Sequence, residues 1–142
     1  MTTLSVRIDE TLVEAARVSA KAEFRSVQGQ IEYWAKLGRA ALDNPDLPVS
    51  FISESLMSLA EPREDSTPFV PRSSSANTAV AAVAQDPAVG ERKKGDLAQL
   101  WVHKFRSGGQ LYLLGYTCDD AVRLVYLEAL GPHENFYRDL KR

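Results

Sequence analysis

The sequence predicts an α+β protein built from two small units. Three features predict this class: a strand pattern followed by two capped helices, a Pro- and Ser-rich stretch in the middle, and strand-type segments joined by short turns. The chain has 142 residues, enough for one ordinary domain or two very small ones. We expect an N-terminal unit at residues 1–60, a linker at 61–77 and a C-terminal unit at 78–142.

Composition limits the classes of function. Residues 1–72 hold 8 Lys/Arg and 11 Asp/Glu, a net charge of −3, whereas residues 73–142 hold 9 and 8, a net charge of +1. A nucleic-acid site would therefore be a local patch. The single cysteine, Cys118, excludes an internal disulfide and a cysteine-based zinc site, and we expect no metal and no cofactor. Since no apolar run approaches about 18 residues, we expect a cytoplasmic protein with no membrane partner.

The first predicted element is a strand at residues 2–8. Its side chains alternate between two faces, as in a strand with one buried face, with Leu4, Val6 and Ile8 opposite Thr3, Ser5 and Arg7. Two helices follow. Asp9 can cap a helix from about Glu10 to Phe24, whose apolar residues recur every four positions at Leu12, Ala16, Ala20 and Phe24. Ser26 can cap the next, from about Val27 to Leu42, which Asn44-Pro45 ends.

One strand and two helices cannot bury a core, because a lone strand leaves both of its edges unpaired. A second copy would supply the missing strand and double the helices. We therefore predict an obligate homodimer through residues 2–8 and 27–42, in which Ala35 and Gly38 allow the helices to approach closely.

Such a two-stranded ribbon has the width of a B-DNA major groove. The outward side chains Thr3, Ser5 and Arg7 are the candidates for contacts with base edges. The start of the second helix offers free backbone N–H groups to a phosphate, which makes Arg25, Ser26 and Val27 further DNA-binding candidates. The alternative is that these polar side chains are only solvated and that Ser26 is only a cap.

The rest of the chain changes from helix to strand. Phe51 to Ala60 is predicted as a short amphipathic helix, and Ala79 to Ala84 as another that stops at Asp86-Pro87. Strands are expected at residues 97–105, 111–116 and 122–130. The sequence RSGGQ between the first two is suited to a hairpin, so these strands form an antiparallel meander. Residues 134–141 are expected to form a last helical turn or two.

Specific stretches of the first half resemble a known family. SVRIDETLVEAA resembles the ribbon-helix-helix fold, and SVQGQIEYWAKLGRAALDNPDLP resembles the ParD-like antitoxins of bacterial type II toxin–antitoxin operons, over roughly residues 3–70. The resemblance implies binding of operator DNA, transcriptional autoregulation and base-reading roles for Thr3, Ser5 and Arg7. It also implies a toxin-wrapping segment at about residues 47–70, which we call the arm, and a cognate RelE/ParE toxin as a partner.

The second half resembles the RelE/ParE toxin superfamily, through DPAVGERKKGDLAQLWVHKF and GPHENFYRDLKR. Many RelE-like members cleave messenger RNA on the ribosome, whereas ParE-like members poison gyrase. RNA cleavage without a metal needs a base, an acid and cations. The candidates are His133, Tyr137 and Arg138 for catalysis and Arg92, Lys93, Lys94 and Lys104 for RNA phosphates. The alternative for the charged C-terminal segment is that it is only a solvated chain end. The alternative for the Lys-Lys-Gly run at residues 93–95 is that it is only a turn.

The chain departs from the toxin pattern, because the first strand and first helix of the family are missing before Asp86. That truncation leaves one sheet edge open and one sheet face poorly covered. Either the arm lies over the exposed face, or strands from two subunits pair.

We interpret the chain as an antitoxin-like DNA-binding autoregulator fused to a toxin-like half that is held in cis and inactive. The first alternative is an active ribosome-dependent endoribonuclease toxin, restrained by the antitoxin half, with the ribosome and mRNA as partners. The second is a protein-binding module in which the toxin-like part supplies a docking surface.

Overall fold

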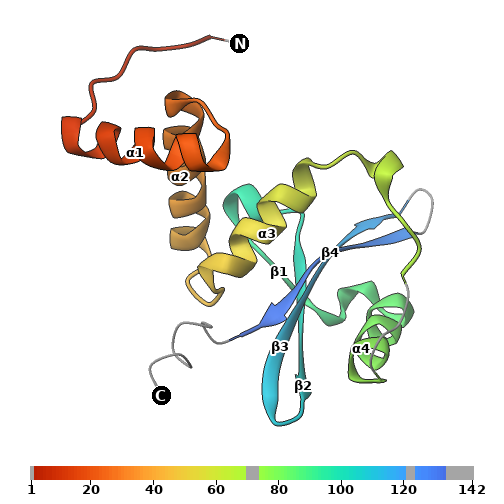
Figure 1. Ribbon diagram of the computed structural model, residues 1–142. Helices are drawn as coiled ribbons and strands as arrows, with labels where there is room; N and C mark the ends of the chain where they lie inside the picture. The colour runs from red at the N-terminus through yellow and green to blue at the C-terminus, as the bar shows by residue number, and fades with distance from the viewer. Residues whose placement is uncertain (1, 70–73, 121–123, 134–142) are drawn as a thin grey trace. The chain divides into compact units, whose positions relative to one another are not determined.

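A computed structural model describes residues 2–69, 74–120 and 124–133. The chain forms two compact units, residues 1–38 and 39–142. Helices come first and a four-strand antiparallel sheet follows (Figure 1), which confirms the predicted α+β class. The predicted functional boundaries at residues 60 and 77 differ from this division into compact units, and they remain a prediction.

The first unit contains the first predicted helix and most of the second, which runs on into the second unit. Helix α1, Glu10–Glu23, begins where the carboxylate of Asp9 accepts hydrogen bonds from the N–H groups of Thr11 and Leu12, at 2.9 and 3.4 Å. It ends at Phe24, which has a left-handed backbone with φ 58°. Helix α2, Val27–Asp43, starts after Ser26, whose Oγ accepts from the N–H of Gly29 at 3.0 Å. Both expected caps are confirmed.

Residues 2–9 form no regular secondary structure in the single chain. Leu4 and Val6, expected on the buried face of a strand, are 88% and 76% exposed. The predicted strand is therefore absent from one chain taken alone. A strand needs a hydrogen-bonding neighbour, and the predicted neighbour belongs to a second copy.

The second unit is built on a sheet of order β1-β2-β3-β4, with each pair antiparallel. Its strands are β1 Glu91–Arg92, β2 Trp101–Ser107, β3 Gln110–Asp119 and β4 Leu124–Pro132. The expected meander of three strands is β2 to β4, and β1 was not expected. The predicted start of the first strand at residue 97 was wrong, because Gly95–Leu97 forms a 3-10 turn in which Gly95 has φ +65°.

The β2–β3 hairpin forms at the Gly-Gly pair. Gly108 and Gly109 have φ of 59° and 80°. A two-residue turn of this kind needs positive φ at both positions, which glycine adopts without steric cost. The hairpin predicted from RSGGQ is confirmed.

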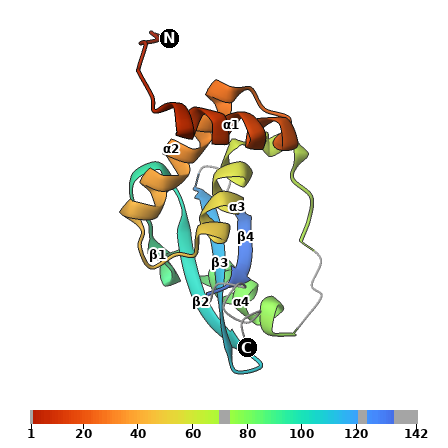
Figure 2. The ribbon, with the colours of Figure 1, turned by 60° about the vertical axis from the view of Figure 1, so that its left-hand side comes forward.

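Helices cover both faces of the sheet (Figures 1 and 2). Helix α4, Ser74–Gln85, packs Ala79 and Val83 against Leu114 and Tyr116 of β3. Helix α3, Val49–Ala60, lies on the opposite face, with Phe51 beside Gly115. Successive side chains of a strand point to opposite faces, so β3 alternates between the two helices. Helix α4 begins within the segment expected to be a linker.

Candidate functional site

The DNA-contact candidates lie in two places in the first unit. Thr3, Ser5 and Arg7 are exposed on the irregular segment before α1. Ser26 and Val27 stand at the start of α2, where Ser26 is engaged as a cap. Only a paired ribbon would give the first three side chains a defined direction, so one chain does not test their role.

Arg25 is already engaged by neighbours on its own unit. Its guanidinium lies 4.1 Å from the ring centroid of Tyr33, forms an ion pair with Glu23 and donates to Oε1 of Gln30 at 3.3 Å. These contacts hold the cation beside the first turn of α2. To contact a DNA phosphate, the guanidinium of Arg25 would have to break its ion pair with Glu23 and pair with the phosphate instead.

In the second unit, the arm packs on the sheet through Phe51. A Cβ on Gly115 would lie 3.0 Å from Cζ of Phe51 and 3.3 Å from Cδ1 of Leu100, so any side chain there would force these neighbours to move. A Cβ on Gly131 would lie 3.9 Å from the same ring. Phe51 and Ile52 are 2% and 0% exposed. Of the two expected ways to cover the sheet, the structure therefore shows the arm over its face.

Glu128 forms the polar centre of the arm–sheet contact. It stands where the register of β3 and β4 shifts, at a bulge, and its side chain is 1% exposed. Arg63 and Ser58 of the arm both donate hydrogen bonds to its carboxylate, and Thr117 of β3 donates another at 2.7 Å. Arg63 also donates to Oγ1 of Thr117 at 3.1 Å and lies 4.4 Å from the ring centroid of Tyr126. A buried carboxylate needs such partners.

The sequence interpretation did not include Glu128, Arg63 or Ser58. One signal was available: Glu128 is the only charged residue between Leu124 and Pro132. A lone charge within an apolar strand predicts a charged partner from another element. Nothing in the sequence indicates that this partner is Arg63.

The end of α2 and the loop that follows it are joined to the segment after β1. The side chain of Asn44 donates to the backbone oxygen of Lys94 at 3.1 Å and accepts from its N–H at 3.0 Å. Arg39 makes a bidentate contact with Asp96, with N–O distances of 2.7 to 2.9 Å. The hydrogen bond and charge of Asp96 raise the pKa of Arg39.

The four candidates for RNA phosphates do not form one open cationic patch. Lys93 is 2% exposed at its side chain, and its Nζ lies 2.6 Å from Asp46 and 3.3 Å from Glu91. Lys104 lies 4.0 Å from Asp46 and is 41% exposed. Arg92 and Lys94 are exposed, and Arg92 donates to the backbone oxygen of Ala98. In this arrangement Lys93 is committed to an internal ion pair.

Asp46 is the acidic partner in that cluster. Burial by itself would raise the pKa of Asp46, but the hydrogen bond and charge of Lys93 outweigh it, so the pKa of Asp46 lies below its usual value. The stability from this pair is therefore present above the usual pKa of an aspartate and is lost as the pH falls through the lowered value.

The three catalytic candidates are only partly within the described residues. His133 comes directly after β4, and its N–H donates to the backbone oxygen of Leu111 at 2.8 Å. Tyr137 and Arg138, and the helical turn predicted at 134–141, lie outside them. The structure thus fixes the backbone of His133 against β3 and leaves the geometry of the trio untested.

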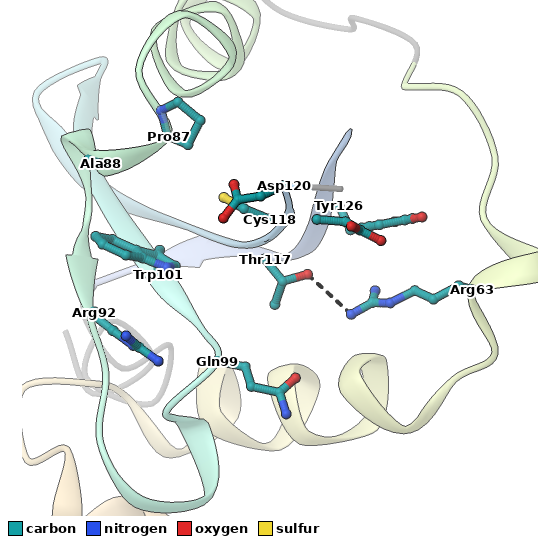
Figure 3. A pocket seen from close by; sticks show the side chains of 11 residues that line it. Arg63, Pro87, Ala88, Arg92, Gln99, Trp101, Thr117, Cys118, Asp120 and Tyr126 are labelled. Carbon is teal, nitrogen blue, oxygen red and sulfur yellow. Dashed lines mark hydrogen bonds between the residues drawn. The ribbon is translucent and has the colours of Figure 1, made fainter. Parts of the chain in front are cut away.

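A cleft of about 630 Å³ opens at one end of the sheet (Figure 3). Arg63 of the arm forms one wall, with Tyr126 beside it, and Arg92, Trp101 and Asp120 line other parts. Cys118 also lines it, but burial and then the charge of Asp120 raise the pKa of the thiol. A thiol held protonated is a poor nucleophile, so the cleft offers mixed charge and no activated cysteine.

The described residues hold neither a candidate metal site nor a candidate membrane-spanning helix. No group of three or more His, Cys, Asp or Glu side chains there is placed to hold a metal ion. None of the helices in the same ranges has the length and apolar character needed to cross a membrane.

An arm packed on the sheet is one of the two arrangements expected for an antitoxin and a toxin joined in one chain. Residues 3–75 match the family model of the ParD-like antitoxin of type II bacterial toxin-antitoxin system, and residues 71–141 match that of the ParE-like toxin of the same kind of system. The chain therefore belongs to both families, an antitoxin domain followed by a toxin domain, as the resemblance predicted. Comparisons with curated proteins and with solved structures gave no match.

Proposed function

We propose that this type II toxin–antitoxin protein acts as a DNA-binding transcriptional autoregulator, whose ParE-like half is held in cis and is not toxic. The observation that carries the second part is the arm over the sheet face, with Phe51 against Gly115 and Arg63 on Glu128. A face that is packed against the chain's own arm is not open to a large target.

The first part depends on dimerisation of the N-terminal unit. Several of its large apolar side chains remain strongly exposed in one chain, with Leu4 at 88%, Val6 at 76%, Val18 at 66% and Phe24 at 96%. Apolar exposure on this scale marks an interaction surface. Pairing of two copies along residues 2–8 would bury Leu4 and Val6 and direct Thr3, Ser5 and Arg7 to the other face, which supports a ribbon that binds operator DNA.

A gel-shift with the DNA upstream of the chain's own gene tests this proposal. We expect Arg7→Ala to weaken binding by roughly 1–3 kcal/mol if the guanidinium meets a guanine. Arg17→Ala is the matched control, since Arg17 is an exposed arginine of α1 paired with Glu14 at 3.5 Å. Binding should fall steeply with salt because phosphate contacts release counterions. Equal binding by both variants, or binding that is insensitive to salt, would contradict a DNA-reading ribbon.

The endoribonuclease alternative is favoured by one observation, the presence of His133, Tyr137 and Arg138 within six residues of sequence. If it holds, weakening the arm with Arg63→Ala should slow bacterial growth, and adding Tyr137→Phe should restore it. Unchanged growth with Arg63→Ala, in a chain shown to be folded, would leave the autoregulator as the supported function.

A further inference from the structure

We infer that the ParE-like half is not a folding unit by itself: residues 39–69, which include most of the arm, complete its core, so their loss unfolds that half instead of releasing a toxin. The inference rests on the arm contact used in the proposed function and adds the consequence of losing that contact. It does not depend on DNA binding.

The first reason is the composition of the core. The sheet face opposite α4 contains Leu100, Val102 and Leu113, which are 0%, 2% and 0% exposed. The helix on that face is α3, which precedes the toxin match at 71–141. A sheet must cover its apolar face to be stable. Of the described elements, residues 71–142 alone would keep α4 on one side and would have none to cover the other face.

The second reason is the buried charge. The carboxylate of Glu128 has one partner from the sheet, Thr117, and two from the arm, Arg63 and Ser58. Arg63 is the cation in this set, so the sheet without the arm keeps a carboxylate at its bulge with a single hydroxyl donor. Removing one partner of a buried ion pair destabilises strongly, because it leaves a charge uncompensated.

The third reason is the edge formed by β1. This strand has only two residues, Glu91–Arg92. The residues after it are fixed from the antitoxin side of the chain, by Asn44 on the backbone of Lys94 and by Asp46 on the buried ammonium of Lys93. Without residues 43–46, Lys93 would retain Glu91 as its described acidic neighbour, 3.3 Å away. The β1 edge would therefore loosen together with the face.

The test starts from the full chain with a specific protease site inserted between Ser66 and Thr67, where the structure is exposed and irregular. After cleavage, the two fragments should elute together under native conditions. They are then separated in denaturant and refolded. The C-terminal fragment contains Trp101 as its only tryptophan. Alone, it should show no cooperative unfolding transition by Trp101 fluorescence, and equimolar N-terminal fragment should restore it.

Arg63→Ala in the cleaved chain should weaken re-association by roughly thirtyfold or more, as expected for truncating one partner of a buried hydrogen-bonded charge pair. Arg17→Ala, in the other unit, is the matched control and should leave it unchanged. A C-terminal fragment that refolds alone, with its own cooperative transition, would overturn the inference. The refolding experiment does not depend on DNA binding, and the gel-shift does not depend on how the C-terminal fragment folds. A failure of this inference can therefore be distinguished from a failure of the proposed DNA binding.

Discussion

Two segments of the chain carry strand-type sequences, but only one of them forms a strand in the single chain. Residues 3–8 leave Leu4 and Val6 88% and 76% exposed, whereas β3 buries Leu113 and Leu114 to 0% and 2%. Residues 3–8 alternate apolar and polar side chains, and β3 contains a run of apolar ones. Both patterns favour a strand, so intrinsic preference does not explain the difference in exposure. The difference lies in what surrounds them.

Strand β3 has β2 and β4 as hydrogen-bonding neighbours and a helix on each face. Residues 2–9 have none of these among the described residues of one chain. A strand is stabilised by cross-strand pairs and by the layers that cover it. If the N-terminal segment forms the proposed ribbon, a second copy would supply the neighbours that β3 finds within its own chain, and substitutions in each region can test this.

The largest effect is expected from Val6→Asp. A carboxylate on the apolar face of the proposed ribbon would be buried without a partner, so we expect loss of the dimer and of DNA binding. Light scattering after size exclusion measures the first and a gel-shift the second. Thr3→Asp places the same charge on the outer face and should leave the dimer intact. A Val6→Asp chain that remains dimeric would show that the segment does not pair as proposed.

Phe51→Ala tests the sheet side of the comparison. Removing the ring leaves a cavity over Gly115, and we expect a loss of about 3–5 kcal/mol in the free energy of unfolding. Met57→Ala, on the same helix at a position that is 51% exposed, should change it by no more than about 0.5 kcal/mol. Denaturant unfolding followed by tryptophan fluorescence measures both. Similar losses for the two variants would mean that α3 is not seated through Phe51.

Gly115→Ala should lower the free energy of unfolding by less than Phe51→Ala. It adds atoms to the contact between the two residues, whereas Phe51→Ala removes them. The added methyl would stand 3.0 Å from Cζ of Phe51, so the ring must move, at a cost of about 1–3 kcal/mol. Combining it with Phe51→Leu should recover part of the loss, because the two positions share one space. Additive losses in that double variant would place Phe51 elsewhere.

The smallest effect is expected at Glu54 of α3. Burial raises the pKa of Glu54 above its ordinary value of 4.5, so the ionised form is disfavoured in the folded chain. Glu54→Gln should therefore stabilise slightly near pH 7. The gain should shrink as the pH falls through the raised pKa, and disappear below the ordinary value, where the carboxyl is protonated in both states. Unfolding titrations at several pH values would show this. A constant gain would mean that the charge is not its source.

Much of the local structure was predictable. The caps Asp9 and Ser26, both long helices and the Gly108-Gly109 hairpin result from short-range rules about hydrogen bonds and allowed backbone angles. The start of β2 was predicted at the wrong residue. A buried apolar residue such as Leu97 fits a strand and a buried turn equally well, so the sequence did not distinguish the two. The two-residue β1 was not foreseen, because two residues carry no strand pattern of their own; Asn44, which holds the segment after β1, lies about 50 residues away in the chain.

The candidate sites were less predictable than the elements. Lys93 belongs to a basic run, and nothing local distinguishes a solvated lysine from one that Asp46 neutralises 47 residues away in the chain. The same holds for Arg63 and Glu128, which are 65 residues apart. Long-range ion pairs depend on which surfaces meet.

The sequence by itself determined the α+β class, the caps and turns, and membership of the ParD-like and ParE-like families, because these depend on neighbouring residues and on specific stretches. Only the tertiary structure decided that α3 of the antitoxin part forms a layer of the toxin sheet, that Gly115 makes room for Phe51, and that Glu128 is neutralised by Arg63. The physical reason is that apolar burial and charge compensation depend on contacts between segments far apart in the chain.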